Sequence, residues 1–319
     1  MKNFVPHLAA ALLPMAGLSA HAAGYPDKPV TIVVPFAPGG SSDSATRTLA
    51  EQLSQKWKKP VVVENKPGAY GSIGAGHAAR AAADGYTILL ASVSVGTINL
   101  FLKNPGFDPV KDLTPVTLVA RGDYVLAVNK MLPVNNMKEL AEYARAHPDK
   151  VNHGAFGSGS MLAFEQFSES MNFKAQNVNY RGEAMSLNAL MAGDVQVMLA
   201  TLSAARPFIE AGRVRPLAIL ARERSPIAPG VPSADESGGR GFYVDFWFGF
   251  MVPNGTPDAV RKQIAADTAD ILKKDNVRKK LYSLGLVATS STPDEFGKLI
   301  QFESTRWIET ARRTGLQAE

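Results

Sequence analysis

The sequence predicts an α/β protein with two lobes, each a mostly parallel sheet flanked by helices and joined to the other by two crossover strands. Apolar, β-branched strands alternate with amphipathic helices along almost the whole chain, a pattern typical of parallel sheets covered on both faces. The C-terminal part offers several helices but only one strand, over residues 242–252, which is too little for a third sheet. We therefore expect this part to return to the first lobe, with crossings near residues 122–124 and 244–248.

Length and composition limit the class of protein. The chain has 319 residues, of which 45% are apolar and 20% charged, an ordinary globular balance for two domains. The absence of cysteine excludes disulfides, thiolate zinc sites and cysteine nucleophiles. The formal net charge of +5 is too diffuse to indicate nucleic-acid binding. We expect a monomer without a metal or cofactor.

The first 22 residues have the pattern of a cleavable secretory signal. A basic start is followed by an Ala/Leu-rich stretch over residues 8–18, and small residues precede a cleavage point after Ala22. The alternative is a membrane anchor, but Pro14 and Gly17 interrupt the apolar stretch, which is shorter than the roughly 20 residues needed to cross a bilayer. The mature protein is therefore expected in the periplasm if the host is a Gram-negative bacterium.

The elements of the first lobe follow one another in a regular order. Strands are predicted at residues 30–34, 61–63 and 86–91, with helices after the first two. The first helix carries its apolar residues Ala45, Leu49, Leu53 and Trp57 at intervals of four, which forms one stripe against a sheet.

The middle of the chain repeats this alternation. Strands are predicted at residues 124–128, 151–156, 178–180, 195–200 and 216–221, with helices between them. A Pro/Gly/Ser-rich surface connection over residues 225–241 then leads to the strand at 242–252 and to the C-terminal helices.

This order implies a discontinuous first domain with a second domain inserted into it. The first comprises residues 23–123 and 246–319, and the second comprises residues 124–245. Two lobes joined by two strands form a hinged clamshell, and a small ligand is expected in the cleft between them.

The main candidates for ligand binding lie in two turns, one in each lobe, where a buried strand leads directly into a helix. The glycines let the backbone approach a ligand, and the first turn of a helix has N–H groups without internal partners that bind anions. A carboxylate could be held there without an arginine, although a purely structural strand–helix corner with Ser and Asp caps is the alternative. The candidate residues are Phe36, Ala37, Pro38, Gly39, Gly40, Ser41, Ser42 and Asp43 in the first turn, and Gly157, Ser158, Gly159 and Ser160 in the second.

Further candidates lie at neighbouring strand ends. Ser92 and Ser94 follow the strand that ends at residue 91, and the alternative is that they are ordinary turn serines. In the second lobe the corresponding strand end is formed by Tyr180, Arg181 and Gly182. Arg181 could pair with a carboxylate, or it could be an exposed surface arginine.

Aromatic residues near the turns and crossings are also candidates. Phe36 and Trp247 are the rings that we expect to line the cleft, although most aromatic residues in strands belong to the core.

Signals for catalysis are weak. His77, His147 and His153 lack metal-ligand spacing to one another, and the sequence contains neither a Gly-x-Ser-x-Gly elbow nor a phosphate-binding loop. We therefore expect a binding protein and not an enzyme. A hydrolase using Ser158 or Ser160 remains the alternative.

An ordered set of short motifs covers the whole mature chain and is highly specific as a set. It consists of residues 34–43 (VPFAPGGSSD), 64–69 (ENKPGA), 83–87 (ADGYT), 108–113 (DPVKDL), 157–160 (GSGS), 180–182 (YRG), 190–195 (LMAGDV) and 255–257 (GTP). On these motifs the chain resembles the Bug-type substrate-binding proteins, the periplasmic receptors of tripartite tricarboxylate transporters.

The resemblance implies a type II periplasmic binding fold and capture of a small mono- or dicarboxylate for delivery to a membrane permease. It further implies that backbone N–H groups and ordered waters hold the carboxylate between residues 36–43 and 157–160. Thr201 is a candidate contact that departs from the family, because Thr201-Leu202 stands where a hydrophobic and often an acidic residue is usual. A sensor subunit that presents the ligand-bound form to a signalling partner is the alternative within the same fold.

Overall fold

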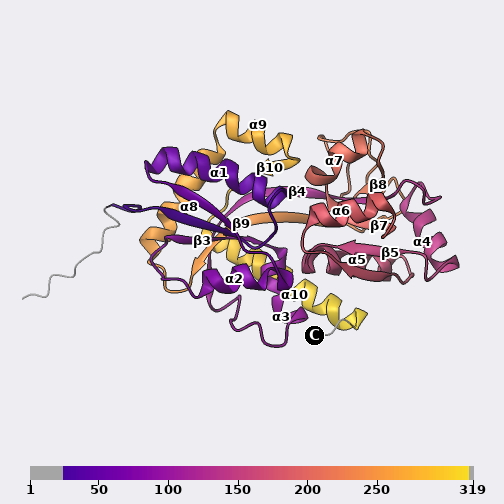
Figure 1. The fold of residues 1–319 in the computed structure, drawn as a ribbon, viewed down its shortest axis with the longest axis horizontal. Helices are drawn as coiled ribbons and strands as arrows, with labels where there is room; N and C mark the ends of the chain where they lie inside the picture. The colour runs from indigo at the N-terminus through magenta and orange to yellow at the C-terminus, as the bar shows by residue number, and fades with distance from the viewer. Residues whose placement is uncertain (1–23, 316–319) are drawn as a thin grey trace, which may run out of the picture.

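The protein has two lobes that lie side by side, with two strands running between them (Figure 1). The computed structural model describes residues 24–315, so the predicted signal over residues 1–22 lies outside the described residues. No helix within this described range is long and apolar enough to span a membrane.

The first lobe is built on a sheet with the strand order β2-β1-β3-β9-β4. Its parallel strands are β1 (Val30–Val34), β2 (Val61–Asn65) and β3 (Thr87–Ser92), and its antiparallel strands are β9 (Asp245–Pro253), β4 (Leu113–Asn129) and the short β10 (Leu286–Ala288). The helices of this lobe are α1 (Ser41–Trp57), α2 (Ser72–Ala79), α3 (Ile98–Phe101), α8 (Asp258–Leu272) and α9 (Asp275–Ser283), with the 3-10 turns η1 (Ala69–Gly71) and η2 (Val93–Thr97).

The second lobe continues the sheet from the far end of β4 in the order β4-β7-β5-β6, with β8 (Val214–Ile219) also paired to β4. Its strands β5 (Asn152–Ala155), β6 (Gln176–Asn179) and β7 (Val197–Thr201) are parallel to one another. The helices are α4 (Met137–Ala146), α5 (Ser158–Ser170), α6 (Glu183–Ala192) and α7 (Leu202–Glu210). Among the described strands, each antiparallel pair involves β4 or β9, and the predicted two-lobed α/β fold is confirmed.

The two crossings are formed by β4 and by the chain that enters β9. β4 pairs with β9 as far as Asp123 and with β7 from Tyr124 onward, so one continuous strand of 17 residues serves both lobes. At the return, the Val244 N–H donates to the Leu220 carbonyl of the second lobe (2.8 Å), and β9 begins at the next residue. The sequence pattern indicated only residues 124–128 of β4. The predicted domain boundaries at 123/124 and 245/246 stay a prediction.

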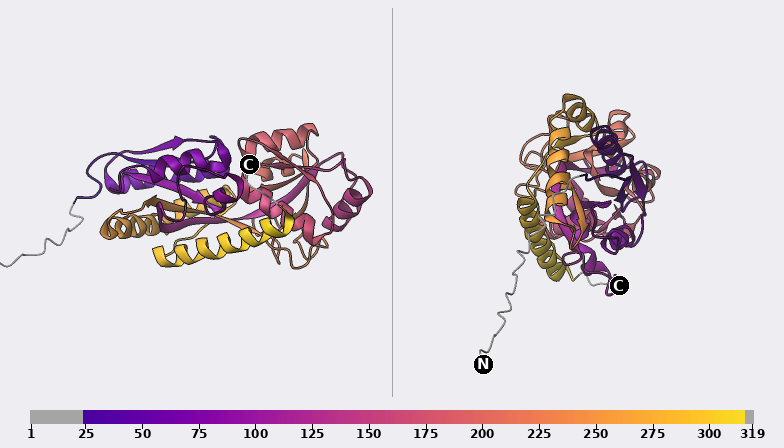
Figure 2. Two further views of the ribbon diagram at one scale, coloured as in Figure 1. Left: turned by 90° about the horizontal axis from the view of Figure 1, so that it is seen from below. Right: turned by 90° about the vertical axis from the view of Figure 1, so that its left-hand side faces the viewer.

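The C-terminal helix α10 (Pro293–Thr314) lies along both lobes (Figure 2). It begins with a capping box between Thr292 and Glu295, as the sequence indicates. Phe296 and Trp307 of α10 are buried in the core. Near its end, Arg313 pairs with Glu169 of α5 at 3.2 Å, which ties this helix to the second lobe.

The core of the first lobe follows the predicted apolar stripe. Ala45, Leu49 and Leu53 of α1 are fully buried, and Trp57 is partly buried beside them. The strands β1 and β3 are buried on both faces, which explains their unbroken apolar sequences. The carboxyl ends of β1 and β3 lie on the side of the sheet that faces the second lobe, because Phe36 and Ser92 line one cavity together with residues of that lobe.

Candidate ligand-binding site

A cavity lies between the lobes at the ends of the strands. It contains about 760 Å³ of empty space, open solvent at its mouth included. Both lobes contribute to its wall. The sequence-predicted residues that line it are Phe36, Ala37, Pro38, Gly40, Ser41, Ser42, Ser92, Ser94, Gly157, Gly159, Ser160, Gly182 and Thr201.

Four α-helices have an N-cap residue that lines this cavity; the N-cap is glycine in three of them, and the fourth, α7, is capped by the Thr201 side chain. The glycine N-caps are Gly40 for α1, Gly157 for α5 and Gly182 for α6, and none of these helix starts receives a capping bond from a described side chain. By contrast, Asn136 and Thr292 cap the starts of α4 and α10 with their side chains. The first N–H groups of α1, α5 and α6 therefore remain available to an anion in the cavity.

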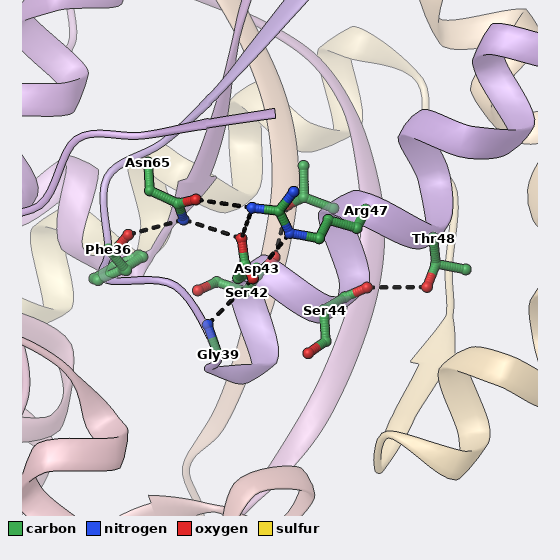
Figure 3. Close-up of polar contacts among 9 residues, drawn as sticks. Phe36, Gly39, Ser42, Asp43, Ser44, Arg47, Thr48 and Asn65 are labelled. Carbon is green, nitrogen blue, oxygen red and sulfur yellow. Dashed lines mark hydrogen bonds and ion pairs between the residues drawn. The ribbon is translucent and has the colours of Figure 1, made fainter. Parts of the chain in front are cut away.

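Asp43 does not line the cavity. It supports the first turn through the hydrogen bonds drawn in Figure 3. Its carboxylate accepts hydrogen bonds from the Gly39 N–H (3.2 Å), from Arg47 Nε (3.1 Å) and from Asn65 Nδ2 (3.0 Å). Burial raises the pKa of Asp43, but these hydrogen bonds outweigh it and hold the pKa below the usual value. The Asn65 amide also donates to the Phe36 carbonyl (3.1 Å), so the turn is fixed at both ends.

The second turn is held by its own serines. Ser160 Oγ donates to the Gly157 carbonyl (3.0 Å) and accepts from the Phe156 N–H (3.1 Å). Ser158 does not line the cavity, because its buried Oγ is 2.7 Å from Thr97 Oγ1 of the first lobe. This hydrogen bond joins the two lobes directly.

Glycines allow the lobes to approach closely at the cavity. A Cβ placed on Gly182 would lie 3.2 Å from the Ala37 Cβ, and one on Gly159 would lie 3.4 Å from the Val93 Cβ. The other lobe thus occupies the space that a side chain would need. Gly39, which does not line the cavity, has φ +90° and faces open space, so its requirement for glycine is conformational.

The expected contribution of Trp247 to the cavity is wrong. Side chains alternate along β9, and Phe246 and Phe248 face the cavity whereas Trp247 points to the other side of the sheet. There the Trp247 ring packs edge-on against Phe296 of α10, with ring centroids 5.1 Å apart. Tyr124 and Phe156, which the sequence did not indicate, complete the aromatic wall with Phe36.

Tyr180 and Arg181 lie beside the cavity and not in its wall. They line an adjoining recess that shares Phe36, Phe156 and Gly157 with the main cavity. The alternative of a surface role for Arg181 therefore stays open.

Glu183 is the most informative lining residue that sequence reasoning missed. It is the first residue of α6 and is buried, with 7% of its surface exposed. Its carboxyl accepts from the Thr201 N–H (2.6 Å) and from Ser41 Oγ of the first lobe (3.3 Å). Burial raises the pKa of Glu183 to about 7, although these hydrogen bonds act in the opposite direction. The signal that could have found it is its position directly after Gly182, at a third strand–helix turn.

The remaining lining residues that sequence reasoning missed are Val93, Ala184 and Met185. None of the residues that line the cavity is lysine, arginine or histidine. Within residues 24–315 no group of His, Asp and Glu side chains could hold a metal ion. An anion would therefore meet backbone N–H groups, hydroxyl groups, aromatic rings and the Glu183 carboxyl, and no cationic side chain of the wall.

Comparisons with known proteins agree with this architecture. Residues 45–316 match the family described as the tripartite tricarboxylate transporter family receptor. Among curated proteins, BugT of Bordetella pertussis is 33% identical over 297 residues, which covers 91% of this chain and 90% of BugT.

Solved structures are also similar to this chain over most of its length. The periplasmic binding protein BugD is 32% identical with a TM-score of 0.86, over 92% of this chain and all of BugD. R. palustris Rpa4515, solved with adipate, is 32% identical with a TM-score of 0.88 over 92% of this chain and all of Rpa4515. MatC from Rhodopseudomonas palustris, solved with bound malate, is 31% identical with a TM-score of 0.84, over 90% of this chain and 99% of MatC.

BugD is a periplasmic binding protein with the same fold as this chain, and the match to the receptor family extends over most of this sequence. The chain belongs to the Bug-type receptors of the tripartite tricarboxylate transporter family.

Proposed function

We propose that the protein is a periplasmic receptor that closes on a small mono- or dicarboxylate and delivers it to the membrane permease of a tripartite tricarboxylate transporter. The observation that carries this proposal is the convergence of three glycine-capped helix starts, from both lobes, on one cavity without a cationic side chain. Such helix starts favour a negatively charged group at the centre of the cavity.

The interaction energies are sufficient for useful affinity. A helix N-terminus contributes about 0.3–1 kcal/mol to a nearby anion, and up to about 2 kcal/mol when the site is partly buried. Each hydrogen bond to a charged group adds about 1.5–3 kcal/mol. Two helix starts with four or five such bonds approach the roughly 8 kcal/mol of a micromolar Kd. The adipate and malate of the two R. palustris structures support a carboxylate as the class of ligand.

The arrangement of the serines argues against the hydrolase alternative. Ser158 is buried against Thr97, and Ser160 donates to a backbone carbonyl of its own turn. His153 stacks on Phe164 in the core, where burial lowers its pKa to about 3 despite its hydrogen bond with Asn177. A serine nucleophile needs a base within hydrogen-bond reach, and no histidine lines the described cavity.

Isothermal titration of the purified protein, stripped of carried-over ligand, tests the binding step. We expect at least one organic acid of a mono- and dicarboxylate panel to bind with a micromolar Kd or better, and neutral sugars of similar size not to bind. Sugar binding without binding of any organic acid contradicts the proposal.

Delivery is tested in cells. Uptake of the bound carboxylate should require both this receptor and the permease. Uptake that persists without the receptor contradicts delivery, and a signalling output that persists without the permease favours the sensor alternative.

A further inference from the structure

The composition of the cavity wall restricts the ligand beyond the presence of a carboxylate. The wall contains five aromatic residues and one carboxyl side chain, that of Glu183, and the other polar side chains are neutral. We propose that the ligand is an aromatic monocarboxylate and that Glu183 is the specificity-determining residue that excludes a second carboxylate. This inference rests on the function proposed above and narrows it to one class of ligand.

The aromatic residues come from both lobes, and three of their rings are in contact. The Tyr124 and Phe246 ring centroids are 5.2 Å apart, and those of Phe246 and Phe248 are 5.4 Å apart. Phe36 and Phe156 complete the wall from the ends of the two ligand-facing strands, β1 and β5. Rings that are tilted or edge-on at these spacings interact favourably with the ring of an aromatic ligand. A flexible aliphatic chain of similar size would lack this ring–ring interaction and should bind less tightly.

The carboxyl of Glu183 makes the part of the wall around it unsuitable for a second carboxylate. Both of its oxygens contact neutral groups, the Thr201 N–H and Ser41 Oγ, and no ion pair connects Glu183 to a described Lys, Arg or His. A second ligand carboxylate would therefore lie near a buried acid without a compensating cation, which is unfavourable.

The hydroxyl groups near Glu183 are already engaged. Ser41 Oγ donates to Glu183, and Thr201 Oγ1 accepts from the Ala204 N–H at 3.4 Å and lies 3.0 Å from Ser203 Oγ. In the second turn, Ser160 Oγ donates to the Gly157 carbonyl. These side chains cannot form new hydrogen bonds to a second carboxylate without losing those they make. The part of the cavity next to Glu183 therefore offers little to a second carboxylate and suits an uncharged body.

Four ligands test separately, in the wild-type protein, whether the site takes a single carboxylate and whether it prefers an aromatic ring. Hexanoate and adipate differ in the second carboxylate alone, and benzoate and cyclohexanecarboxylate differ in the aromaticity of the ring. By isothermal titration at pH 8 we expect benzoate to bind tightest, and hexanoate to bind at least tenfold tighter than adipate. If adipate binds more tightly than hexanoate, the claim that the site takes a single carboxylate is overturned. If cyclohexanecarboxylate binds more tightly than benzoate, the claim that the ligand is aromatic is overturned.

Variants test whether Glu183 is the residue that excludes a second carboxylate. Glu183→Gln should reduce the hexanoate-to-adipate affinity ratio about tenfold, because it removes the charge and keeps the side-chain shape. The matched control is Glu165→Gln, a half-buried carboxyl of the same lobe that contacts Asn177 outside the cavity, and its ratio should equal that of the wild type. An unchanged ratio in Glu183→Gln overturns the role of Glu183.

The wild-type ratios need no variant and decide the ligand class even if Glu183→Gln fails to fold. If none of the four acids binds but other organic acids do, the inference fails and the proposed function stands. If no organic acid binds at all, the proposed function itself fails.

Discussion

At the scale of single residues, the charge of Glu183 should make ligand affinity depend on pH. Its raised pKa of about 7 means that the side chain is mostly neutral at pH 6 and mostly charged at pH 8. An anionic ligand is repelled by the charged form only, and unit charges about 8 Å apart at an effective dielectric constant near 20 interact by about 2 kcal/mol. We therefore expect the affinity for benzoate to be roughly 5- to 10-fold weaker at pH 8 than at pH 6.

The measurement is the Kd for benzoate by isothermal titration at both pH values, on wild type and Glu183→Gln. The variant should show a much smaller change, because it cannot lose a proton at this position. A wild-type Kd that improves as the pH rises would contradict the assignment.

A second prediction at this scale concerns Asp43, which acts on the site through the first turn. Asp43→Ala removes the acceptor for the Gly39 N–H, Arg47 and Asn65, and hydrogen bonds to a charged group contribute about 1.5–3 kcal/mol each. We expect a lower Tm and at least a tenfold weaker Kd. Asp258→Ala is the control, because that carboxylate forms exposed pairs with Arg261 and Lys262 far from the cavity in the fold, and its Kd should be unchanged. Equal Kd values for the two variants would refute the supporting role of Asp43.

At the scale of elements, the helix starts predict which substitutions matter. Gly159→Val places a branched side chain where a Cβ alone would already be 3.4 Å from Val93, so the second turn can no longer approach the first lobe. Ser42→Ala removes a hydroxyl and leaves the backbone N–H groups of α1 in place. We expect Gly159→Val to weaken the Kd by more than tenfold and Ser42→Ala by less than fivefold, measured by titration with the same ligand. The reverse order would mean that side chains and not the backbone hold the anion.

The elements also show how far the sequence could predict the site. The glycine-rich turns were recognisable because a strand, a turn and a helix with unpaired N–H groups follow one another in local sequence, and most of their residues line the cavity. The orientation of β9 was not recognisable. Three aromatic residues in a row alternate between two faces, and the packing of α10 against one face decides that Trp247 is the one turned away.

The length of β4 was missed for a related reason. Pro115, Arg121, Gly122 and Asp123 interrupt its apolar pattern, and they are accommodated because β9 and β10 pair with this part of the strand. Such pairings join residues more than a hundred positions apart, which a local pattern does not contain. Glu183 escaped attention because its importance depends on Ser41 and Thr201, which the fold brings to it from distant elements.

At the scale of the whole molecule, the lobes are in contact through hydrogen bonds that cross the cleft. Besides the Ser158–Thr97 bond, the Asn179 amide donates to the Tyr70 hydroxyl (2.9 Å) and Ser41 donates to Glu183. These contacts favour a closed arrangement, and a ligand that touches both lobes should increase its population. We expect the radius of gyration from small-angle X-ray scattering to decrease when a bound carboxylate is added.

Gly182→Val tests this closure, because its side chain would meet Ala37 across the cleft. We expect the variant to keep the fold and to show little change in radius when ligand is added, together with a weaker Kd. Met131→Ala is a control on the exposed surface of the second lobe and should close like the wild type. Normal closure and affinity in Gly182→Val would show that the lobes do not need this close approach.

Titration of the tightest-binding acid of the panel and of its primary amide tests the central claim most directly. The two compounds have nearly the same shape, and only the acid is negatively charged at pH 7. If the uncapped starts of α1, α5 and α6 hold an anion, the acid should bind at least a hundredfold tighter than the amide. Equal affinity for acid and amide would contradict an anion site at the junction of the two lobes.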